Sequence, residues 1–185
     1  ARSPRIIPTG RTFSYLLKEG EPCLTVSQTD VRAIQLAKAA LYAGIKLLMD
    51  KQGVDHVDRI GLAGAFGSFI DPKYALVLGL VPDCDLDKVK AVGNAAGTGA
   101  RMALLNRDHR REIELTVTRI EKIETALESK FQQHFVNAMA LPNKVDAFPR
   151  LAEVVKLPER SMDTDLADGI EPGAGRRRGG RRNRG

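Results

Sequence analysis

The sequence predicts an α/β fold, a mixed sheet covered by helices, and three of its segments carry this prediction. Residues 27–52 have the periodicity of one long amphipathic helix. Residues 57–78 and residues 88–105 each begin as a short apolar strand, pass through glycines and continue as a helix. Strands that alternate with helices are typical of the α/β class.

The helix expected after Ser27 has clear signals at both ends. Ser27 and Asp30 are spaced as a capping box, in which each side chain accepts a hydrogen bond from a backbone N–H that the helix leaves free. Gln52-Gly53 ends the helix. Between these ends one apolar stripe follows helical spacing: Val31, Ile34, Ala37, Leu41, Ile45 and Leu48.

The other predicted elements are shorter. Residues 5–26 have the pattern of short strands and turns, as at the end of a sheet whose other strands lie upstream. Asp71 and Pro72 are good cap and first residues for a helix that ends at Gly79. Further helices are expected at 93–105, 108–116 and 129–139, the last with Phe131, Phe135 and Val136 facing inward, and a strand at 117–125.

Composition limits the classes of protein and of site. The 185 residues are 43% hydrophobic, which suffices for one core. Six of the 29 basic residues are arginines in the last ten positions, so the rest of the chain balances 23 basic against 23 acidic residues, and we do not expect nucleic acid as a partner. Two distant thiols, Cys23 and Cys84, cannot supply a four-ligand metal site and indicate a cytoplasmic protein. No apolar run approaches the roughly 20 residues that cross a membrane.

Two glycine-rich segments follow the predicted strands, at residues 62–68 and 92–99. A strand, a glycine turn and a helix bring backbone N–H groups to an anionic or nucleotide ligand. Neither segment has the Gly-Lys-Ser/Thr ending of a P-loop or the glycine spacing of a dinucleotide fingerprint. Taken singly, each segment is more often structural than ligand-binding.

Together, and in this order, the two segments resemble the superfamily of actin, sugar kinases and the large ATP-driven chaperones. Residues 60–67 resemble its adenosine turn, which follows a strand of the second lobe, and residues 95–103 resemble the small-residue helix that packs against the other lobe at the hinge. The turn departs from the pattern at Ala65, where the superfamily usually has a second glycine. The resemblance implies one lobe of an actin-like (ribonuclease H-like) ATPase fold.

A tighter resemblance extends from about Gln28 to Pro142. Four motifs occur in order at residues 28–40, 63–67, 79–82 and 93–100, and they look like the C-terminal domain of the ATP-dependent reductive activators of corrinoid proteins. The resemblance implies ATP with magnesium, a [2Fe–2S] cluster in an upstream domain, and a corrinoid protein as partner. It implies electron transfer that returns Co(II) corrinoid to Co(I). A second copy of the chain, in a homodimer, is a further partner that we consider.

The residue pattern and the resemblance together divide the chain and assign its site. We expect the end of an upstream sheet at 1–26, the nucleotide-binding lobe at 27–150 and a linker at 151–161. The Gly, Asp and Arg content of residues 162–185, with almost no apolar residues, predicts a disordered Arg/Gly-rich tail. The nucleotide-binding residues would be Gly64, Ala65, Phe66, Gly67 and Ser68 with Gln35 and Lys38 of the long helix, and the hinge residues Gly93, Asn94, Ala96, Gly97 and Gly99. No catalytic or metal-binding residue is assigned, and the fragment alone is expected to be inactive.

Several of these residues also have plainer interpretations. Lys38 also fits a solvated lysine on the polar face of its helix, and Asn94 also fits a structural residue of a tight turn. Asp83, Asp85 and Asp87 alternate as in a calcium loop without its later Gly and Glu, so Asp85 or Asp87 is expected to be a helix cap. For the whole chain, the alternatives are a lobe of another actin-like kinase or of a dehydratase activator, or a non-catalytic protein-docking module.

Overall fold

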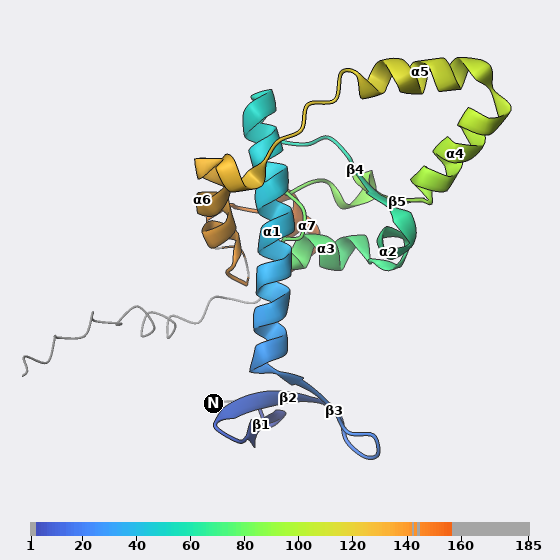
Figure 1. Cartoon of the computed structure of the whole chain (residues 1–185). Coiled ribbons are helices and arrows are strands. Elements are labelled where there is room, and N and C mark those ends of the chain that lie inside the picture. The colour runs from blue at the N-terminus through green and yellow to red at the C-terminus, as the bar shows by residue number, and fades with distance from the viewer. Residues whose placement is uncertain (1–2, 142, 144, 157–185) are drawn as a thin grey trace, which may run out of the picture.

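The computed structural model describes residues 3–141, 143 and 145–156, and it confirms the α/β class (Figure 1). The strands of this part lie in two sheets. One is antiparallel, with the order β1 (Ile6–Thr9), β2 (Thr12–Lys18) and β3 (Leu24–Ser27). The other pairs β4 (Ile60–Ala63) with β5 (Val89–Gly93) in parallel. The helices are α1 (Gln28–Gln52), α2 (Gly64–Phe69), α3 (Pro72–Leu78), α4 (Ala95–Leu105), α5 (Arg107–Val117), α6 (Ser129–Ala138) and α7 (Pro149–Val154).

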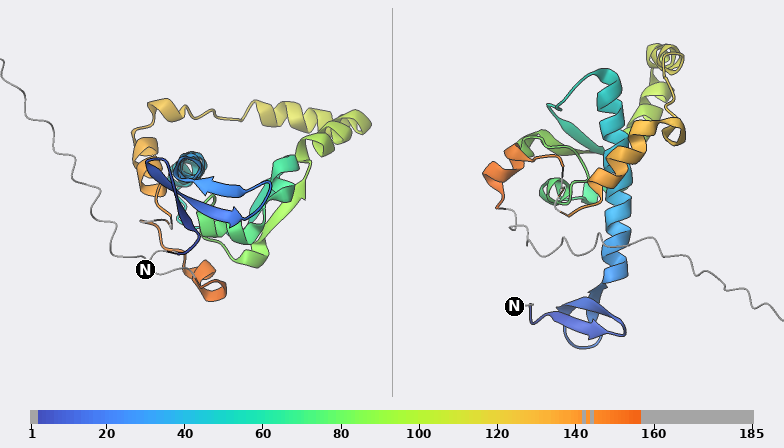
Figure 2. Two further views of the ribbon diagram at one scale, coloured as in Figure 1. Left: turned by 90° about the horizontal axis from the view of Figure 1, so that it is seen from below. Right: turned by 90° about the vertical axis from the view of Figure 1, so that its left-hand side faces the viewer.

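Helix α1 is the axis of the structure. The β1–β2–β3 sheet lies at the N-terminal end of α1. The view along the helix axis shows α1 between α6 on one side and, on the other, strands β4 and β5 with helices α2 and α3, here called the β4–β5 unit (Figure 2). Ser27 and Asp30 form the predicted capping box, with the Ser27 N–H donating to Asp30 at 2.8 Å. Gly53 ends α1 in the left-handed conformation at φ 67°. Both predicted ends are therefore confirmed.

The buried face of α1 differs from the predicted stripe. Lys38, Ala39, Tyr42, Ala43, Leu47 and Met49 are buried. Val31, Ile34, Leu41 and Leu48 are 38–52% exposed, and of the stripe only Ile45 packs against a core cluster. Helical spacing locates an apolar face, but it does not say whether another part of the protein covers that face.

Two hydrophobic clusters form the core. The larger joins α3, the loop after it, β5 and α7 through Ala75, Leu76, Val81, Cys84, Val89 and Leu151. The smaller lies between α1 and α6, with Ala39, Tyr42 and Ala138. Phe148 packs against both clusters and so connects them.

Three predictions about the second half of the chain need correction. Helix α5 runs to Val117, and residues 118–124 form no strand before a 3₁₀ turn at Thr125–Leu127. Val136 of α6 points outward at 51% exposure, whereas Phe135 does pack against the core. The linker predicted from residue 151 begins too early, because α7 runs to Val154 and Leu151 is buried. The predicted tail at 162–185 lies outside the described residues.

Helices α4 and α5 form an arch that leaves the body after β5 and returns toward α6 (Figure 1). Neither helix has a buried residue. The arch exposes large apolar side chains, among them Leu104, Leu105 and Val117. Within the described part of the chain, none of the helices has the length and apolar character needed to pass through a lipid bilayer.

Candidate functional site

The carboxyl ends of β4 and β5 bring the two glycine-rich segments together. The strands run in parallel, Leu62 pairs with Ala91, and after a register shift Ala63 pairs with Gly93. Helix α2 therefore begins beside the residue that precedes α4. The carboxyl edge of a parallel strand pair is where open α/β proteins bind ligands.

The first segment is helical and is not the turn that the sequence suggested. Helix α2 starts directly after β4, and the Ser68 hydroxyl donates to the Gly64 carbonyl at 2.9 Å. Gly64 has a φ of +86°, which an L side chain rarely adopts, and a Cβ there would meet no atom within 4 Å. The bend of the chain at the end of β4 therefore requires glycine, and the space beside this bend is open.

Gly67 has a structural role in the same helix. A Cβ at this position would lie 2.8 Å from the carbonyl carbon and 2.9 Å from the carbonyl oxygen of Leu62. Gly67 is buried, so it allows α2 to pack directly on the backbone of β4. Ala65, Phe66 and Ser68 are exposed on the same helix, Phe66 at 81%.

The second segment is a capped helix start. Asn94 accepts a hydrogen bond from the Gly97 N–H at 2.8 Å and is the N-cap of α4, so the turn expected here is a cap. Gly93 precedes it with a φ of +70°. Ala96 is exposed, and Gly99 lies further along the helix, in a hollow between α4 and α5.

Arg101 was not singled out in the sequence. It lines an open hollow with Asn94, Gly97 and Thr98 at the start of α4. Gly97 and Arg101 are four residues apart and so share one face of the helix. The sequence did contain a signal for Arg101, because it is the one charged residue in a helix otherwise made of small and apolar residues.

Lys38 is neither solvated nor open to a ligand. Its side chain is fully buried, and its ammonium donates to the Ala140 carbonyl. A Cβ on Gly79, which ends α3, would be 3.6 Å from Nζ, so the ammonium lies against the C-terminal end of that helix. Burial lowers the pKa of Lys38 to about 8. Gln35, one turn earlier on α1, is half-buried.

The low pKa of Lys38 predicts a pH dependence of stability. Between pH 8 and 10.5 the unfolded chain holds a proton that the folded protein has released, so this residue makes the free energy of unfolding increase with pH. We expect the difference between wild type and Lys38→Met to change by about 1–2 kcal/mol in favour of wild type from pH 8 to pH 9.5. Urea unfolding at both pH values measures it.

Comparing each variant with wild type removes contributions that both proteins share. Burial raises the pKa of Cys84 and of Tyr42, and both groups act in the opposite direction as the pH increases. Lys88→Met, which removes the amine of an exposed lysine, serves as the control for the substitution itself. An equal pH response in Lys38→Met and wild type would contradict the assignment.

Of the three alternating aspartates Asp83, Asp85 and Asp87, Asp83 is the one whose side chain caps a helix. Its two carboxylate oxygens accept hydrogen bonds from the Arg150 and Leu151 N–H groups, at 2.9 and 3.1 Å, at the start of α7. Asp85 stands before a 3₁₀ turn without a side-chain cap, and Asp87 lies inside that turn. The prediction of Asp85 or Asp87 as a cap therefore holds only for the position of Asp85, whose side chain makes no capping hydrogen bond, and the helix that Asp83 caps starts 66 residues further along the chain.

Comparison with known proteins decides the family. Residues 1–152 match the family model described as the C-terminal domain of RACo, the ASKHA domain. The chain belongs to this family. The predicted resemblance and the actin-like superfold are thereby confirmed.

Two relatives of this ASKHA domain act in corrinoid activation. The corrinoid activation enzyme RamQ of Eubacterium limosum is 38% identical over 119 residues, which are 63% of this chain and 20% of that protein. The solved structure of a reductive activator for a corrinoid, iron-sulfur protein superposes with a TM-score of 0.64 at 29% identity and covers 75% of this chain and 23% of that one. The chain thus spans about a fifth of the length of these relatives.

Proposed function

We propose that this chain is the nucleotide-binding portion of an ATP-dependent reductive activator, which returns Co(II) corrinoid proteins of methyltransferase systems to Co(I). One observation carries the proposal. The register of β4 and β5 sets Ala63 beside Gly93, so both glycine-rich segments meet at one carboxyl edge. The names of the two relatives supply the class of reaction.

Residues at this edge fit the adenosine side of ATP. Gly64 leaves space at the end of β4, and Ala65, Phe66 and Ser68 are exposed beside it. The start of α4 adds backbone N–H groups and the cationic side chain of Arg101. We propose that Gly64, Ala65, Phe66 and Ser68 contact the nucleoside and that Gln35 contacts it from α1. Gly67 is left out, because it is buried against the backbone of β4. Lys38 is left out, because its ammonium is buried against Ala140.

Helix α4 is the proposed hinge element. Gly93 and Asn94 set the direction of α4. Ala96, Gly97 and Gly99 have no side chain larger than a methyl group, so another backbone can approach this helix closely. The lack of buried residues in α4 fits a helix whose partner surface belongs to the upstream lobe.

The remaining parts of the reaction are assigned to the parent protein. Among the described residues no group of three or more His, Cys, Asp and Glu side chains could hold a metal ion, and we propose that magnesium is held by upstream residues. A [2Fe–2S] cluster would likewise be held by upstream residues, where it would supply the single electron needed to return Co(II) to Co(I). Because that couple has a very negative potential, nucleotide-driven closure must supply differential binding energy to the corrinoid protein.

A second copy of the chain is the further partner that we propose. The exposed apolar residues Val31, Ile34, Leu41 and Leu48 of α1 give such a copy a surface to cover. Light scattering of the complete parent protein tests this, and a monomeric mass at all concentrations would exclude it.

Calorimetric titration tests the proposed function. MgATP and MgADP are added separately to the complete parent protein and to this chain. We expect binding by the parent and binding at least about tenfold weaker by the chain, because phosphate contacts would be missing. No binding to the parent would reject the ATPase assignment and favour a protein-docking module.

A further inference from the structure

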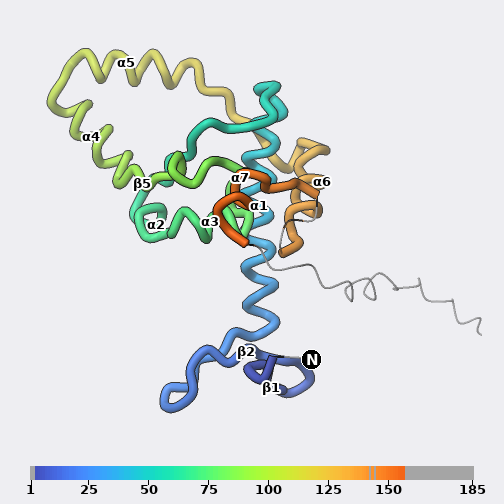
Figure 3. The backbone as a smooth tube through the Cα atoms, turned by 180° about the vertical axis from the view of Figure 1, so that it is seen from behind, coloured from blue at the N-terminus to red at the C-terminus, as the bar shows by residue number. Residues whose placement is uncertain are grey.

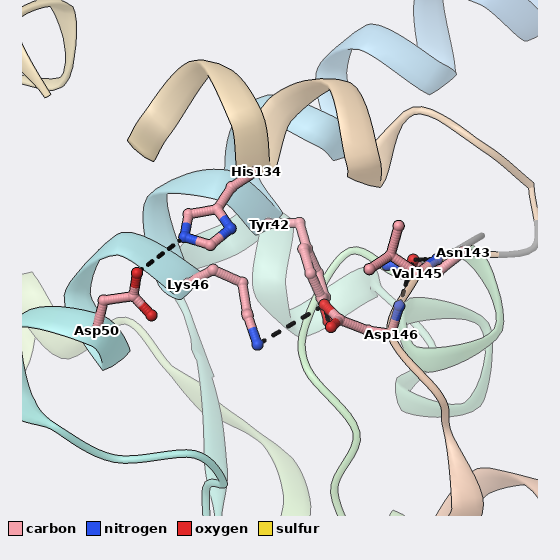
Figure 4. A network of polar contacts seen from close by, with 7 residues as sticks. All are labelled: Tyr42, Lys46, Asp50, His134, Asn143, Val145 and Asp146. Atoms are coloured by element: carbon pink, nitrogen blue, oxygen red, sulfur yellow. Dashed lines mark hydrogen bonds and ion pairs between the residues drawn. The ribbon is translucent and has the colours of Figure 1, made fainter. Parts of the chain in front are cut away.

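The last described segment connects parts of the fold that otherwise share few contacts. Residues 145–156, here called the C-terminal strap, lie against α1 at their beginning and against the β4–β5 unit at their end (Figure 3). Figure 4 shows how the strap is held at α1. The Tyr42 hydroxyl donates to Asp146 at 2.7 Å, and Lys46 lies 3.7 Å from the same carboxylate.

The middle of the strap joins the two hydrophobic clusters. Phe148 packs against the Tyr42 ring, with ring centroids 6.4 Å apart, and also against the cluster of α3 and β5. Among the described residues of α1, only Ile45 packs against that larger cluster. The strap therefore provides much of the connection between α1 and the β4–β5 unit.

Helix α7 fastens the strap at the amino ends of both parallel strands. Asp83, in the loop before β5, accepts the two N–H hydrogen bonds at the start of α7. The Arg150 guanidinium donates to the Val57 carbonyl before β4 at 3.4 Å and lies 3.7 Å from Asp85. Leu151 fills the core between these contacts at 1% exposure.

We propose that the C-terminal strap positions the two halves of the nucleotide site, with Asp83, Phe148 and Arg150 as positioning residues. One half is α1 with Gln35, and the other is the carboxyl edge of β4 and β5 with Gly64 and Asn94. Fastening the amino ends of the strand pair fixes where its carboxyl ends lie, because a paired strand moves as one piece. The inference rests on the proposed function, since it concerns the same site.

Substitution of Asp83 in the complete parent protein tests the strap. Asp83→Ala removes both acceptors and leaves two N–H groups of α7 without a protein partner. We expect its dissociation constant for MgATP to increase about tenfold, with the stoichiometry of binding unchanged. Asp83→Asn keeps one carbonyl oxygen in place and should restore most of the affinity.

Two control variants separate positioning from general destabilisation. Glu153→Ala changes an exposed residue of α7 and should bind as wild type does. Gly53→Ala strains the left-handed end of α1 at a residue that is not among those contacting the strap, and should lower stability without changing the dissociation constant. Equal affinities of Asp83→Ala and wild type, or an equal loss in Gly53→Ala, would overturn the proposal.

Hydrogen exchange provides a readout that needs no nucleotide. In Asp83→Ala we expect faster amide exchange at residues 60–69 and 89–97 and unchanged exchange at residues 12–18. Unchanged exchange at 60–69 and 89–97 would overturn the strap. A wild-type parent that binds no ATP would instead reject the proposed function, so the two failures are distinguishable.

Discussion

Gly67→Ala should destabilise this domain by about 2–3 kcal/mol, because the new methyl group would overlap the backbone of its own preceding strand. The Cβ would lie 2.8 Å from the Leu62 carbonyl carbon, which is backbone and not the end of a flexible side chain. We expect α2 to shift away from β4 and the nucleotide edge to be lost with it. Urea unfolding of the chain measures the loss of stability.

Gly99→Ala is the matched control for this substitution. It adds the same methyl group inside helix α4, where a Cβ would meet no atom within 4 Å. Alanine loses less conformational entropy than glycine on folding, so we expect Gly99→Ala to stabilise the chain by about 0.5–1 kcal/mol. Similar stabilities of the two variants would contradict the close packing of α2 on β4.

Leu151→Ala should cost about 2–5 kcal/mol of stability, as expected for truncating a buried leucine. Leu151 is 1% exposed among Ala75, Leu76 and Val89, so its removal leaves a cavity in the larger hydrophobic cluster. The same residue was expected to open a linker, where truncation would have almost no effect. Chemical denaturation therefore distinguishes the two descriptions directly.

Val154→Ala provides the comparison within the same helix. Val154 is 60% exposed at the end of α7, and truncating it should change stability by no more than about 0.5 kcal/mol. Equal effects of the two truncations would mean that α7 does not dock on the core.

The sequence predicted those elements whose signals are local. Helix α1 has its capping box at Ser27 and its glycine end at Gly53 within the helix itself. Helix α3 likewise starts with Asp71 as cap, accepting from the Lys73 N–H, and ends at Gly79. Such residues act on their own neighbours in the chain, so their pattern suffices.

Contacts between distant residues could not be predicted in this way. The burial of Lys38 depends on Ala140, and the capping by Asp83 depends on a helix that starts at Pro149. Each residue alone has the appearance of an ordinary surface charge. The stripe of α1 is the converse case, because an apolar face was recognised correctly while Val31 and Leu48 remain 38% and 52% exposed.

The candidate site was predicted in part, because it combines local sequence signals with a contact between distant residues. The glycines of both segments were identified from their spacing, but only the pairing of Ala63 with Gly93 brings them to one edge. For the first segment the sequence also suggested a turn before the helix, where α2 begins directly after β4, whereas the helix predicted at 93–105 is present as α4. Strand register joins residues 30 positions apart, and periodicity carries no information about it.

The most direct test of this account is the affinity of the complete parent protein for MgATP after Ala65→Val, compared with Ala152→Val. Both alanines are exposed on short helices, so both variants should fold as wild type does. If the nucleoside approaches α2 closely, Ala65→Val should weaken binding about tenfold or more, while Ala152→Val leaves it unchanged. Equal affinities of the two variants would contradict a nucleotide at the carboxyl edge of β4 and β5.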